Sequence, residues 1–280
     1  MSRQLPAPLA AHASSSVGGR LLTISDLAVE ATLPSRKLVI LDHVDVEIRP
    51  GEIVGVVGES GSGKTTLARA VVGLLERNVS VTSGSIELGD QLVRSPDVNQ
   101  SQRVRGSQVG MVFQDASRSL NPLFKVHAQL AEVLRRHESR ISKEQIKQRS
   151  EEVLRQMRID DPERVLGSYP HQLSGGLRQR VAIGLAVITR PSLVIADECT
   201  TALDVTTQTK VVELFRHLVN ELRIGLLFVT HDLMLASDLC DRVVVMSEGK
   251  VVESGSVLEV LDSPREPYTQ RLLAAIPAWN

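Results

Sequence analysis

The sequence predicts an α/β protein in which a central parallel sheet is joined to an antiparallel β subdomain and an inserted α-helical subdomain. Continuous apolar runs that end in polar residues alternate with helical patterns, which is typical of buried parallel strands. Short β-rich runs separated by turn residues fill residues 21–57 and 79–113. Residues 125–166 are charged and helical by pattern, so they interrupt the alternation. The continuous apolar runs occupy residues 53–58, 192–198 and 224–232.

The expected elements follow one another in a simple order. The first β-rich runs lead through the turn "RPGE" (49–52) into the buried run "IVGVVG". The next segment, "TTLARAVVGLLE" (65–76), carries apolar residues at helical spacing. The later elements that we expect are a short strand in "SQVGMVFQ" (107–114), an apolar helix over 181–190, a hairpin over 242–255 around Glu248-Gly249, and helical structure after it.

The composition limits the classes of function. The chain has 280 residues, of which 42% are hydrophobic and only 2% aromatic, so its large core must be aliphatic. The formal net charge of −1 argues against a nucleic-acid scaffold or a polybasic membrane patch. The two cysteines, Cys199 and Cys240, are far apart, which fits a reducing compartment and argues against disulfides or a zinc site. We expect both to be small buried residues.

The N-terminal segment is expected to be a disordered tail. Residues 1–20 are rich in Ala, Ser, Pro and Gly, and Pro6 and Pro8 break their short apolar part. We therefore expect no signal peptide. No apolar run approaches the roughly 18 residues that span a bilayer, so we expect a soluble, cytoplasmic chain that reaches a membrane only through a partner.

The stretch "GESGSGKTT" fits the pattern G-x-x-x-x-G-K-[ST] and lies between a buried strand and a helix. Its glycines allow successive N–H groups to face one concavity, and the helix N-terminus adds partial positive charge. Lys64 is aimed at the β- and γ-phosphates, and the Thr65 hydroxyl at Mg²⁺. A flexible Gly/Ser loop is the alternative, and the strand and helix argue against it. The predicted nucleoside-triphosphate contacts are Gly58, Glu59, Ser60, Gly61, Ser62, Gly63, Lys64, Thr65 and Thr66.

Two carboxylates end the run "SLVIADE". Asp197, at the end of a buried strand, is placed as expected for a carboxylate that holds Mg²⁺. Glu198 could orient or deprotonate an attacking water, a step that hydrolysis requires. On its own an Asp-Glu pair would more often be a solvated loop. His231 ends the next buried run and should face the same edge of the sheet. A lone histidine is more often structural or at the surface, and its position alone leaves both interpretations open.

The stretch "LSGGLRQR" (173–180) has no counterpart in ordinary P-loop kinases or GTPases. With it, the chain resembles the ATP-binding cassette (ABC) ATPases over about residues 21–275. The motifs follow the family order: the phosphate loop, a glutamine after a strand (Gln114), "LSGG", "LVIADE", the "TALD" loop (201–204) and a histidine. The resemblance implies a P-loop NTPase (RecA-like) core, with ATP and Mg²⁺ as ligands.

The resemblance also implies roles for individual residues. Glu198 resembles the family's catalytic base, and His231 resembles the residue that contacts the γ-phosphate and positions the water. Gln114 resembles the residue that links Mg²⁺ and the attacking water to the helical subdomain. Asp204 resembles a dimer-contact aspartate. The family binds ATP in a head-to-tail dimer, so Ser174, Gly175 and Gly176 would contact the γ-phosphate of ATP held by the other subunit.

A finer resemblance is to the peptide/nickel (oligopeptide-type) importer ATPases. The stretches "QDASRSLNPLFKV" (114–126) and "SPREPYTQRLLAAIP" (263–277) match patterns of that subfamily. It implies uptake of di- or oligopeptides, nickel, or an opine- or metallophore-like ligand. The implied partners are two membrane permeases, an extracytoplasmic binding protein and a second, usually different, ABC ATPase, at the cytoplasmic face of the membrane.

This resemblance also implies a division of the chain. After the tail, residues 21–255 form the ATPase domain, with the helical subdomain over about 115–178, and residues 256–280 form a C-terminal helical extension. The chain departs from the subfamily at three positions. Cys199 replaces a proline, Leu177 replaces Gln or Met, and no aromatic residue near Ala31 is available to stack on adenine. No C-terminal cysteine cluster is present, so we expect no iron–sulfur centre.

Rival functions make different demands on the sequence. A soluble ABC ATPase acting on ribosomes usually carries two cassettes, and one acting on DNA carries a long coiled coil before "LSGG". Here about a hundred residues separate Thr66 from Ser174, enough for a small helical subdomain. A P-loop kinase or GTPase would leave "LSGG" and "TALD" unexplained. An exporter often has membrane helices fused to its cassette.

Overall fold

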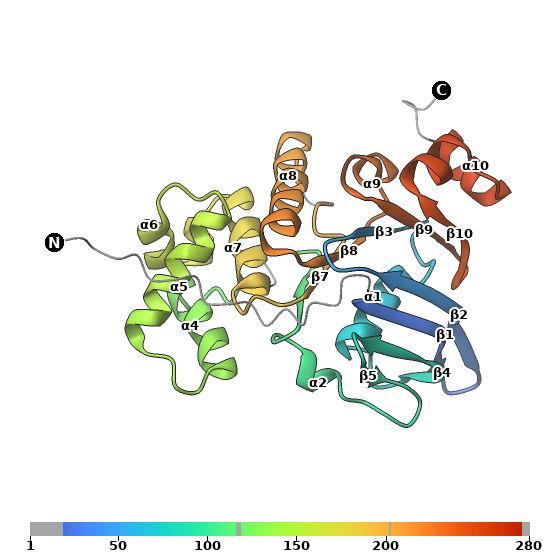
Figure 1. Ribbon diagram of the computed structural model, residues 1–280, viewed down its shortest axis with the longest axis horizontal. Helices are drawn as coiled ribbons and strands as arrows, with labels where there is room; N and C mark the ends of the chain where they lie inside the picture. Colours follow the sequence, from blue (N-terminus) through green and yellow to red (C-terminus); the bar gives the residue numbers. More distant parts are fainter. Residues whose placement is uncertain (1–18, 116–118, 202, 276–280) are drawn as a thin grey trace.

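The computed structural model describes residues 19–115, 119–201 and 203–275, so the predicted N-terminal tail lies almost entirely outside the described residues. The molecule is elongated (Figure 1): the inserted helices lie at one end, and the six-stranded sheet runs from the middle to the other end, where β9 and β10 lie beside the antiparallel sheet. In the described residues, no helix combines the length and apolar character that a membrane crossing requires.

The antiparallel sheet has four strands in the order β2-β1-β4-β5. Its strands bury one face, as the spacing of apolar residues in β1 illustrates: Leu22 and Ile24 are buried and Ser25 is exposed. This confirms the antiparallel strands expected before the phosphate loop. The strands are β1 (Leu22–Thr32), β2 (Lys37–Ile48), β4 (Val79–Leu88) and β5 (Gln91–Arg94).

The central sheet has the order β10-β9-β3-β8-β7-β6, and all neighbours are parallel except the edge hairpin of β9 and β10. Every residue of β3, β7 and β8 is buried, which explains their continuous apolar runs. Both faces of the sheet are therefore covered. The strands are β3 (Ile53–Val57), β6 (Val109–Val112), β7 (Leu193–Asp197), β8 (Gly225–Val229), β9 (Arg242–Ser247) and β10 (Lys250–Ser256).

Alternate residues of the buried strands serve two cores. In β7, Leu193 and Ile195 pack with the antiparallel sheet and α1, whereas Val194 and Ala196 pack with the inserted helices and α8. Packing on both faces therefore holds the sheet in place, and the carboxyl ends of β3, β7 and β8 lie at the same edge of it. The helices of this part are α1 (Lys64–Val72), α2 (Ser101–Val104), α8 (Val205–Leu222) and α9 (Leu233–Leu239).

Two helices differ in length from the sequence prediction. The apolar pattern over 65–76 predicts a helix through Glu76, but α1 ends at Val72 because Gly73 adopts a left-handed conformation with φ 65°. The helix expected over 181–190 begins earlier, because the Ser174 hydroxyl accepts the N–H of Leu177 and caps it. The inserted helices are α4 (Val126–His137), α5 (Lys143–Gln156), α6 (Pro162–Gly167), the 3-10 turn η1 (Pro170–Gln172) and α7 (Gly175–Val187).

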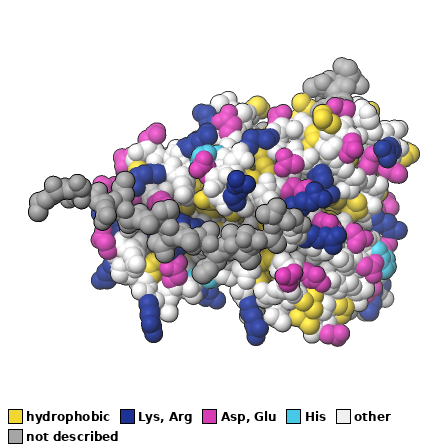
Figure 2. Space-filling view, in the orientation of Figure 1, with side chains coloured by type: hydrophobic (Ala, Val, Ile, Leu, Met, Phe, Trp, Pro, Cys, Tyr) yellow, Lys and Arg dark blue, Asp and Glu magenta, His cyan; other side chains and the backbone are white. Residues whose placement is uncertain are grey.

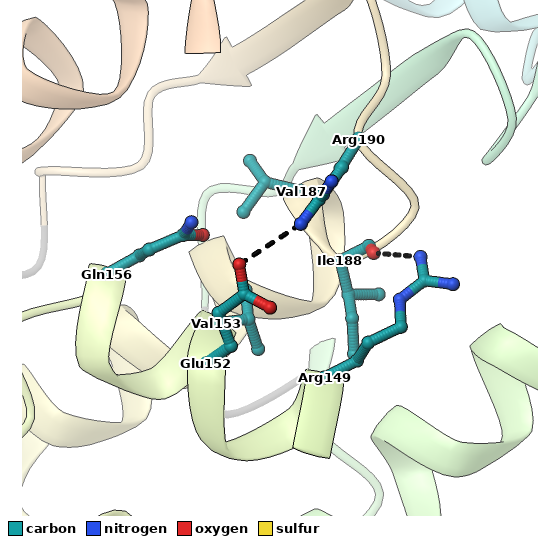
Figure 3. A pocket seen from close by; sticks show the side chains of 7 residues that line it. All are labelled: Arg149, Glu152, Val153, Gln156, Val187, Ile188 and Arg190. Atoms are coloured by element: carbon teal, nitrogen blue, oxygen red, sulfur yellow. Dashed lines mark hydrogen bonds and ion pairs between the residues drawn. The ribbon is translucent and has the colours of Figure 1, made fainter. Parts of the chain in front are cut away.

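Two arginines fasten α5 to the end of α7 (Figure 3). Arg149 donates to the carbonyl of Ile188 at 3.0 Å, and Arg190 donates to Oε1 of Glu152 at 3.0 Å. A cation at the C-terminus of α7 also suits the negative end of the helix dipole. The cavity between these side chains has a volume of about 10 Å³, the size of one water, so α7 is held closely against α5.

The chain ends in a π-helical turn, η2 (Leu258–Asp262), and a short helix, α10 (Pro267–Ala274). Thr269 and Leu273 of α10 are buried, and α10 lies beside β9 and β10 (Figure 1). The helical structure expected after the hairpin is therefore present up to residue 275, and residues 276–280 lie outside the described residues.

Candidate functional site

The phosphate loop joins β3 to α1, as the sequence predicts, and its conformation requires glycine. Gly61 and Gly63 have φ angles of 85° and 102°, which residues with a side chain rarely adopt. Gly58 also lies against the end of β9, where an added Cβ would come within 2.1 Å of the carbonyl oxygen of Met246. The loop is thus wrapped tightly around the start of α1.

Lys64 places a buried cation at this loop. Its side chain is only 3% exposed, and its ammonium donates to the carbonyl oxygens of Gly58 at 2.9 Å and Glu59 at 2.7 Å. Burial lowers the pKa of Lys64, although the carboxylates of Glu198 and Asp197 oppose this. A buried ammonium whose hydrogen bonds within the described residues go to neutral carbonyls is well suited to receive an anion.

The start of α1 adds further donors. Gly63 provides no side-chain cap, and the first turn of α1 carries no acidic residue, so its N–H groups remain available to a phosphate. The Ser62 hydroxyl is buried and has no hydrogen-bond partner among the described residues. The loop therefore has the donors, the positive charge and the backbone geometry that fit a nucleoside triphosphate.

Thr65 and Asp197 meet across the site. The Thr65 hydroxyl donates to Oδ1 of Asp197 at 3.0 Å. Asp197 is 5% exposed, and burial raises the pKa of its carboxyl, whereas the hydrogen bond from Thr65 lowers it. Within the described residues no group of three or more His, Cys, Asp or Glu could hold a metal by itself. Two oxygen ligands that need phosphate oxygens to complete the shell suit Mg²⁺.

Glu198 is the point at which three predicted residues meet. Its Oε2 accepts a hydrogen bond from Nε2 of Gln114 at 3.1 Å, and its Oε1 lies 3.6 Å from Nδ1 of His231. The Glu198 backbone is left-handed, with φ 46°, and its N–H donates to the carbonyl of Val229 at 2.9 Å. Such a conformation is costly for a residue with a side chain, so the surrounding structure must hold Glu198 in it.

His231 is not a core histidine. It follows β8, and its side chain is 47% exposed, whereas that of Glu198 is 17% exposed. His231 therefore lies at the same edge as Glu198, as predicted from its place after a buried strand, and its part in catalysis stays a prediction. Its imidazole is accessible to a ligand that approaches the phosphate loop.

The "LSGG" residues lie at the start of α7 and not in the phosphate loop. Ser174 caps α7, and an added Cβ on Gly176 would lie 3.3 Å from Cγ2 of Thr207 in α8. Asp204 caps α8 by accepting from the N–H of Thr207 at 3.0 Å and from its hydroxyl at 2.7 Å, and the hydroxyl bond lowers the Asp204 pKa. No hydrogen bond in the described part of the chain joins residues 174–176 to residues 58–66.

Two of the three departures from the importer pattern, at Cys199 and near Ala31, have structural counterparts. Cys199 is buried, and burial raises the pKa of its thiol to about 12, so it is a packing residue beside Glu198. Cys240 is likewise buried. Ala31 is 6% exposed and pairs across the sheet with Leu38, which is 45% exposed. An aliphatic Leu38 rather than an aromatic residue therefore provides the apolar surface at this register.

One contact with the phosphate loop could not be predicted from the motifs. The N–H of Glu59 donates to the hydroxyl of Tyr268 in α10 at 3.2 Å. Tyr268 belongs to the C-terminal pattern that resembles peptide importers, and this match is the sequence signal that singled out the segment.

The surface charge agrees with the composition. On the face shown in Figure 2, Lys and Arg side chains are interspersed with Asp and Glu side chains. Binding to nucleic acid normally uses a continuous positive surface, and this face does not present one.

Comparison with known proteins gives consistent results. Residues 41–201 match the ABC transporter family. The glutathione import ATP-binding protein GsiA of Salmonella choleraesuis (strain SC-B67) is 40% identical over 267 residues, which cover 92% of this chain and 42% of that protein. A putative peptide import ATP-binding protein of Brucella melitensis biotype 1 is 42% identical over 263 residues, which cover 92% of this chain and 78% of that protein. The chain thus spans less than half the length of GsiA.

Two solved structures share the fold. The dimeric ATP-binding cassette MJ0796, in a post-hydrolysis state bound to ADP and Pi, has a TM-score of 0.73 and 27% identity, and covers 84% of this chain and 98% of its own. The cbiO1 structure from Clostridium perfringens, part of the ABC transporter complex cbiONQ, has a TM-score of 0.74 and 26% identity. The match covers 93% of this chain and 97% of the cbiO1 chain. The predicted fold class, a P-loop NTPase core with antiparallel β and helical additions, is confirmed.

Proposed function

This chain belongs to the ABC transporter family, and from that premise we propose that it is the ATP-hydrolysing subunit of an importer for di- or oligopeptides or a related small ligand. The observation that supports hydrolysis most directly is the approach of Gln114 and His231 to the Glu198 carboxylate, at 3.1 and 3.6 Å. A protein that only binds ATP needs the phosphate loop but has no need of a carboxylate held in this way.

ATP would bind with its phosphates over residues 58–66. The N–H groups at the start of α1 and the Lys64 ammonium would hold the β- and γ-phosphates. We propose that Thr65 and Asp197 hold Mg²⁺, with Gln114 as a further contact. Mg²⁺ bound there would neutralise charge on the transferred phosphoryl group. The 3.0 Å contact of Thr65 with Asp197 supports this assignment.

Glu198 is proposed as the general base. Its carboxylate would accept a proton from the attacking water, and the Gln114 amide, which donates to Oε2, would fix its orientation. His231 would contact the γ-phosphate and position the same water. Cys199, the next residue, is buried in the hydrophobic core, and burial raises the pKa of its thiol to about 12, so we propose no chemical role for it.

The active unit is proposed to be a head-to-tail dimer of cassettes. Ser174, Gly175 and Gly176 carry the donors of a helix N-terminus, and we propose that they bind the γ-phosphate of ATP held by the other subunit. The dimeric state of the similar cassette MJ0796 supports this arrangement. Asp204, which caps α8, would contact the partner. We propose that the partner is a different ATPase chain.

The membrane partners are proposed from similarity and from exposed apolar residues. GsiA and the Brucella protein bear the names of import ATP-binding proteins, which supports two permeases, an extracytoplasmic binding protein and a location at the cytoplasmic face of the membrane. Leu123 and Phe124 are 78% and 53% exposed. In the segment 114–126, of which residues 116–118 lie outside the described residues, they offer an apolar surface to a permease.

Movement would pass from the nucleotide to the permeases through the helical subdomain, proposed over about 115–178. Residues 21–255 are proposed as the complete ATPase domain and 256–280 as its extension. Closure of the dimer on two ATP molecules would move α4–α7 with the permeases, and hydrolysis would reopen it. The tight packing of α5 on α7 supports movement of these helices as one body.

The experiment that tests this function is purification of the tagged chain from native membranes in mild detergent, with its partners identified by mass spectrometry. We expect two multi-span permeases and a second cassette. Recovery only from the soluble fraction, without a hydrophobic partner, would contradict import and favour the alternative, a soluble ABC ATPase that acts on DNA or ribosomes.

A further inference from the structure

The phosphate loop is supported from outside by the C-terminal helix. The Glu59 N–H donates to the hydroxyl of Tyr268 at 3.2 Å, although the two residues are 209 positions apart. Glu59 is the second residue of the phosphate loop, and Tyr268 lies in the first turn of α10. A residue of the C-terminal extension therefore touches the main chain of the nucleotide site directly.

The same peptide group also binds Lys64. The N–H of Glu59 and the carbonyl of Gly58 belong to one planar peptide, and every described peptide bond is trans, so the two groups point in opposite directions. Tyr268 accepts from the N–H side, and the Lys64 ammonium donates to the carbonyl side at 2.9 Å. Rotation of this peptide would break both contacts together. Hydrogen bonds that share one polarised group also strengthen each other.

Helix α10 is itself held firmly. The Glu253 carboxylate of β10 accepts from the N–H of Arg265 at 2.8 Å and of Glu266 at 3.3 Å, just before α10 begins. Thr269 and Leu273 are buried. The aromatic ring of Tyr268 is half-buried and packs against the larger hydrophobic core, so its hydroxyl has a fixed position.

A cavity lies beside the hydrogen bond between Glu59 and Tyr268. A cavity of about 460 Å³ is lined by residues of the loop and of α10, and Tyr268 is one of its lining residues. The hydroxyl therefore acts as a discrete support at the edge of this space. The residues that line the cavity come from the loop, from the tip of the β9–β10 hairpin and from α10, and include Ser60, Gly61, Ser247, Glu248, Arg271 and Leu272.

We propose that Tyr268 is a positioning residue for nucleotide binding: through the Gly58–Glu59 peptide it fixes the carbonyl that holds the Lys64 ammonium. The inference rests on the proposed ATP site. It assigns to the C-terminal extension a part in the nucleotide affinity of the cassette. Without the hydroxyl, the peptide can rotate, and Lys64 loses one of the two carbonyls that hold it ready for the phosphates.

The test uses Tyr268→Phe in the full chain, with Tyr169→Phe as the matched control. Tyr169 is the other tyrosine of the chain, and it contacts His171 and Lys125 through its ring. Tyr268→Phe keeps the ring and removes only the hydroxyl. Two quantities are measured: the Kd of a fluorescent ATP analogue with Mg²⁺, and hydrogen exchange of the backbone amides of residues 58–63 without nucleotide.

We expect Tyr268→Phe to weaken the analogue about threefold to tenfold, as for the loss of one hydrogen bond, and to speed exchange in residues 58–63. At saturating ATP the turnover rate should change less than the Kd. Tyr169→Phe should change neither quantity. Unchanged affinity with Tyr268→Phe, or faster exchange without weaker binding, would overturn the proposal.

A second variant tests whether Tyr268 acts through its hydrogen bond with Glu59 or through a general effect on the rigidity of the phosphate loop. Glu59→Pro removes the N–H that Tyr268 accepts, so in that background Tyr268→Phe should have no further effect on affinity. If Glu59→Pro and Tyr268→Phe each weakened affinity and their fold-changes multiplied in the double variant, the proposed route through Glu59 would be overturned. If the unaltered chain bound no ATP analogue, the proposed function would fail. The exchange measurement would then still decide whether Tyr268 holds the loop, and unchanged exchange would refute that contact.

Discussion

Oε1 of Glu198 lies 3.6 Å from Nδ1 of His231, at the ends of two neighbouring parallel strands. The strands β7 and β8 are paired from Leu193 to Asp197, so the residues that follow them are delivered to the same edge. This places an imidazole beside the proposed general base, in a position that is half open to solvent. The relationship supports hydrolysis rather than simple binding of ATP.

Replacement of His231 by Ala should lower the rate of ATP hydrolysis about 100-fold or more, because the group proposed to position the water is lost. The affinity for ATP should change little, since residues 58–66 hold the phosphates. Steady-state kinetics with the isolated chain and with its partner ATPase would measure both. His127→Ala, at an exposed position of α4, is the control and should keep full activity. A large rise in KM with unchanged kcat would contradict the role of His231.

Asp197→Asn should remove activity and yet stabilise the nucleotide-free protein. Burial raises the Asp197 pKa, so the folded state disfavours the carboxylate relative to the unfolded chain, and this penalty acts above the raised pKa. The amide oxygen of Asn can still accept from Thr65. We therefore expect Asp197→Asn to have a higher Tm than the unaltered chain at pH 7.

The stabilisation expected from Asp197→Asn should depend on pH. As the pH falls through the raised pKa of folded Asp197 towards the unfolded value of about 3.9, the carboxyl becomes protonated and the penalty disappears. The difference in Tm between Asp197→Asn and the unaltered chain should therefore shrink on acidification. Scanning calorimetry between pH 7 and pH 4 measures it, and a gap that widens would contradict the account.

Lys64→Met should abolish ATP binding with only a small change in stability. The substitution removes the cost of burying an ammonium but also removes its hydrogen bonds to Gly58 and Glu59, and these effects oppose each other. Calorimetric titration with ATP and a thermal melt would measure the two results. Lys210→Met, on the exposed face of α8, is the matched control and should bind ATP normally. Retention of ATP affinity in Lys64→Met would refute its phosphate role.

Ser174→Arg should separate binding from hydrolysis. The bulky cation blocks the start of α7 but lies away from residues 58–66, so each chain should still bind ATP while hydrolysis falls at least tenfold, as for loss of donors at the γ-phosphate. Ser139→Arg, at an exposed position after α4, should remain active. If this chain pairs with itself, mixing Ser174→Arg with Lys64→Met should restore part of the activity, because one intact site then forms between two chains. Loss of ATP binding by Ser174→Arg would contradict a site completed by the partner.

The sequence predicts much of this site because its motifs coincide with simple physical patterns. The apolar runs before Asp197 and His231 are buried strands, and parallel strands deliver their following residues to one edge. The glycines of 58–63 are needed at left-handed positions, which the phosphate-loop pattern encodes. These relations are local or follow directly from strand order, so they can be read along the chain.

Other features depend on packing that no short pattern records. The left-handed backbone of Glu198 is not expected for glutamate, and it results from the tight turn after β7. The apolar pattern does not predict the early start of α7, because Gly175 and Gly176 have low helix propensity, and the Ser174 cap compensates for it. The bond between Glu59 and Tyr268 needs the relative placement of α10 and the loop, which follows only from the complete fold.

The central claim is that Glu198 activates water for ATP bound between two cassettes. The most direct measurement is the turnover rate of Glu198→Gln together with its mass by light scattering in the presence of Mg·ATP, with Glu221→Gln on α8 as the control. The account predicts a rate lower by about 100-fold to 10,000-fold and a stable dimer that retains ATP, since binding persists while proton removal is lost. A Glu198→Gln protein that remains monomeric with ATP and hydrolyses it at the normal rate would contradict the account.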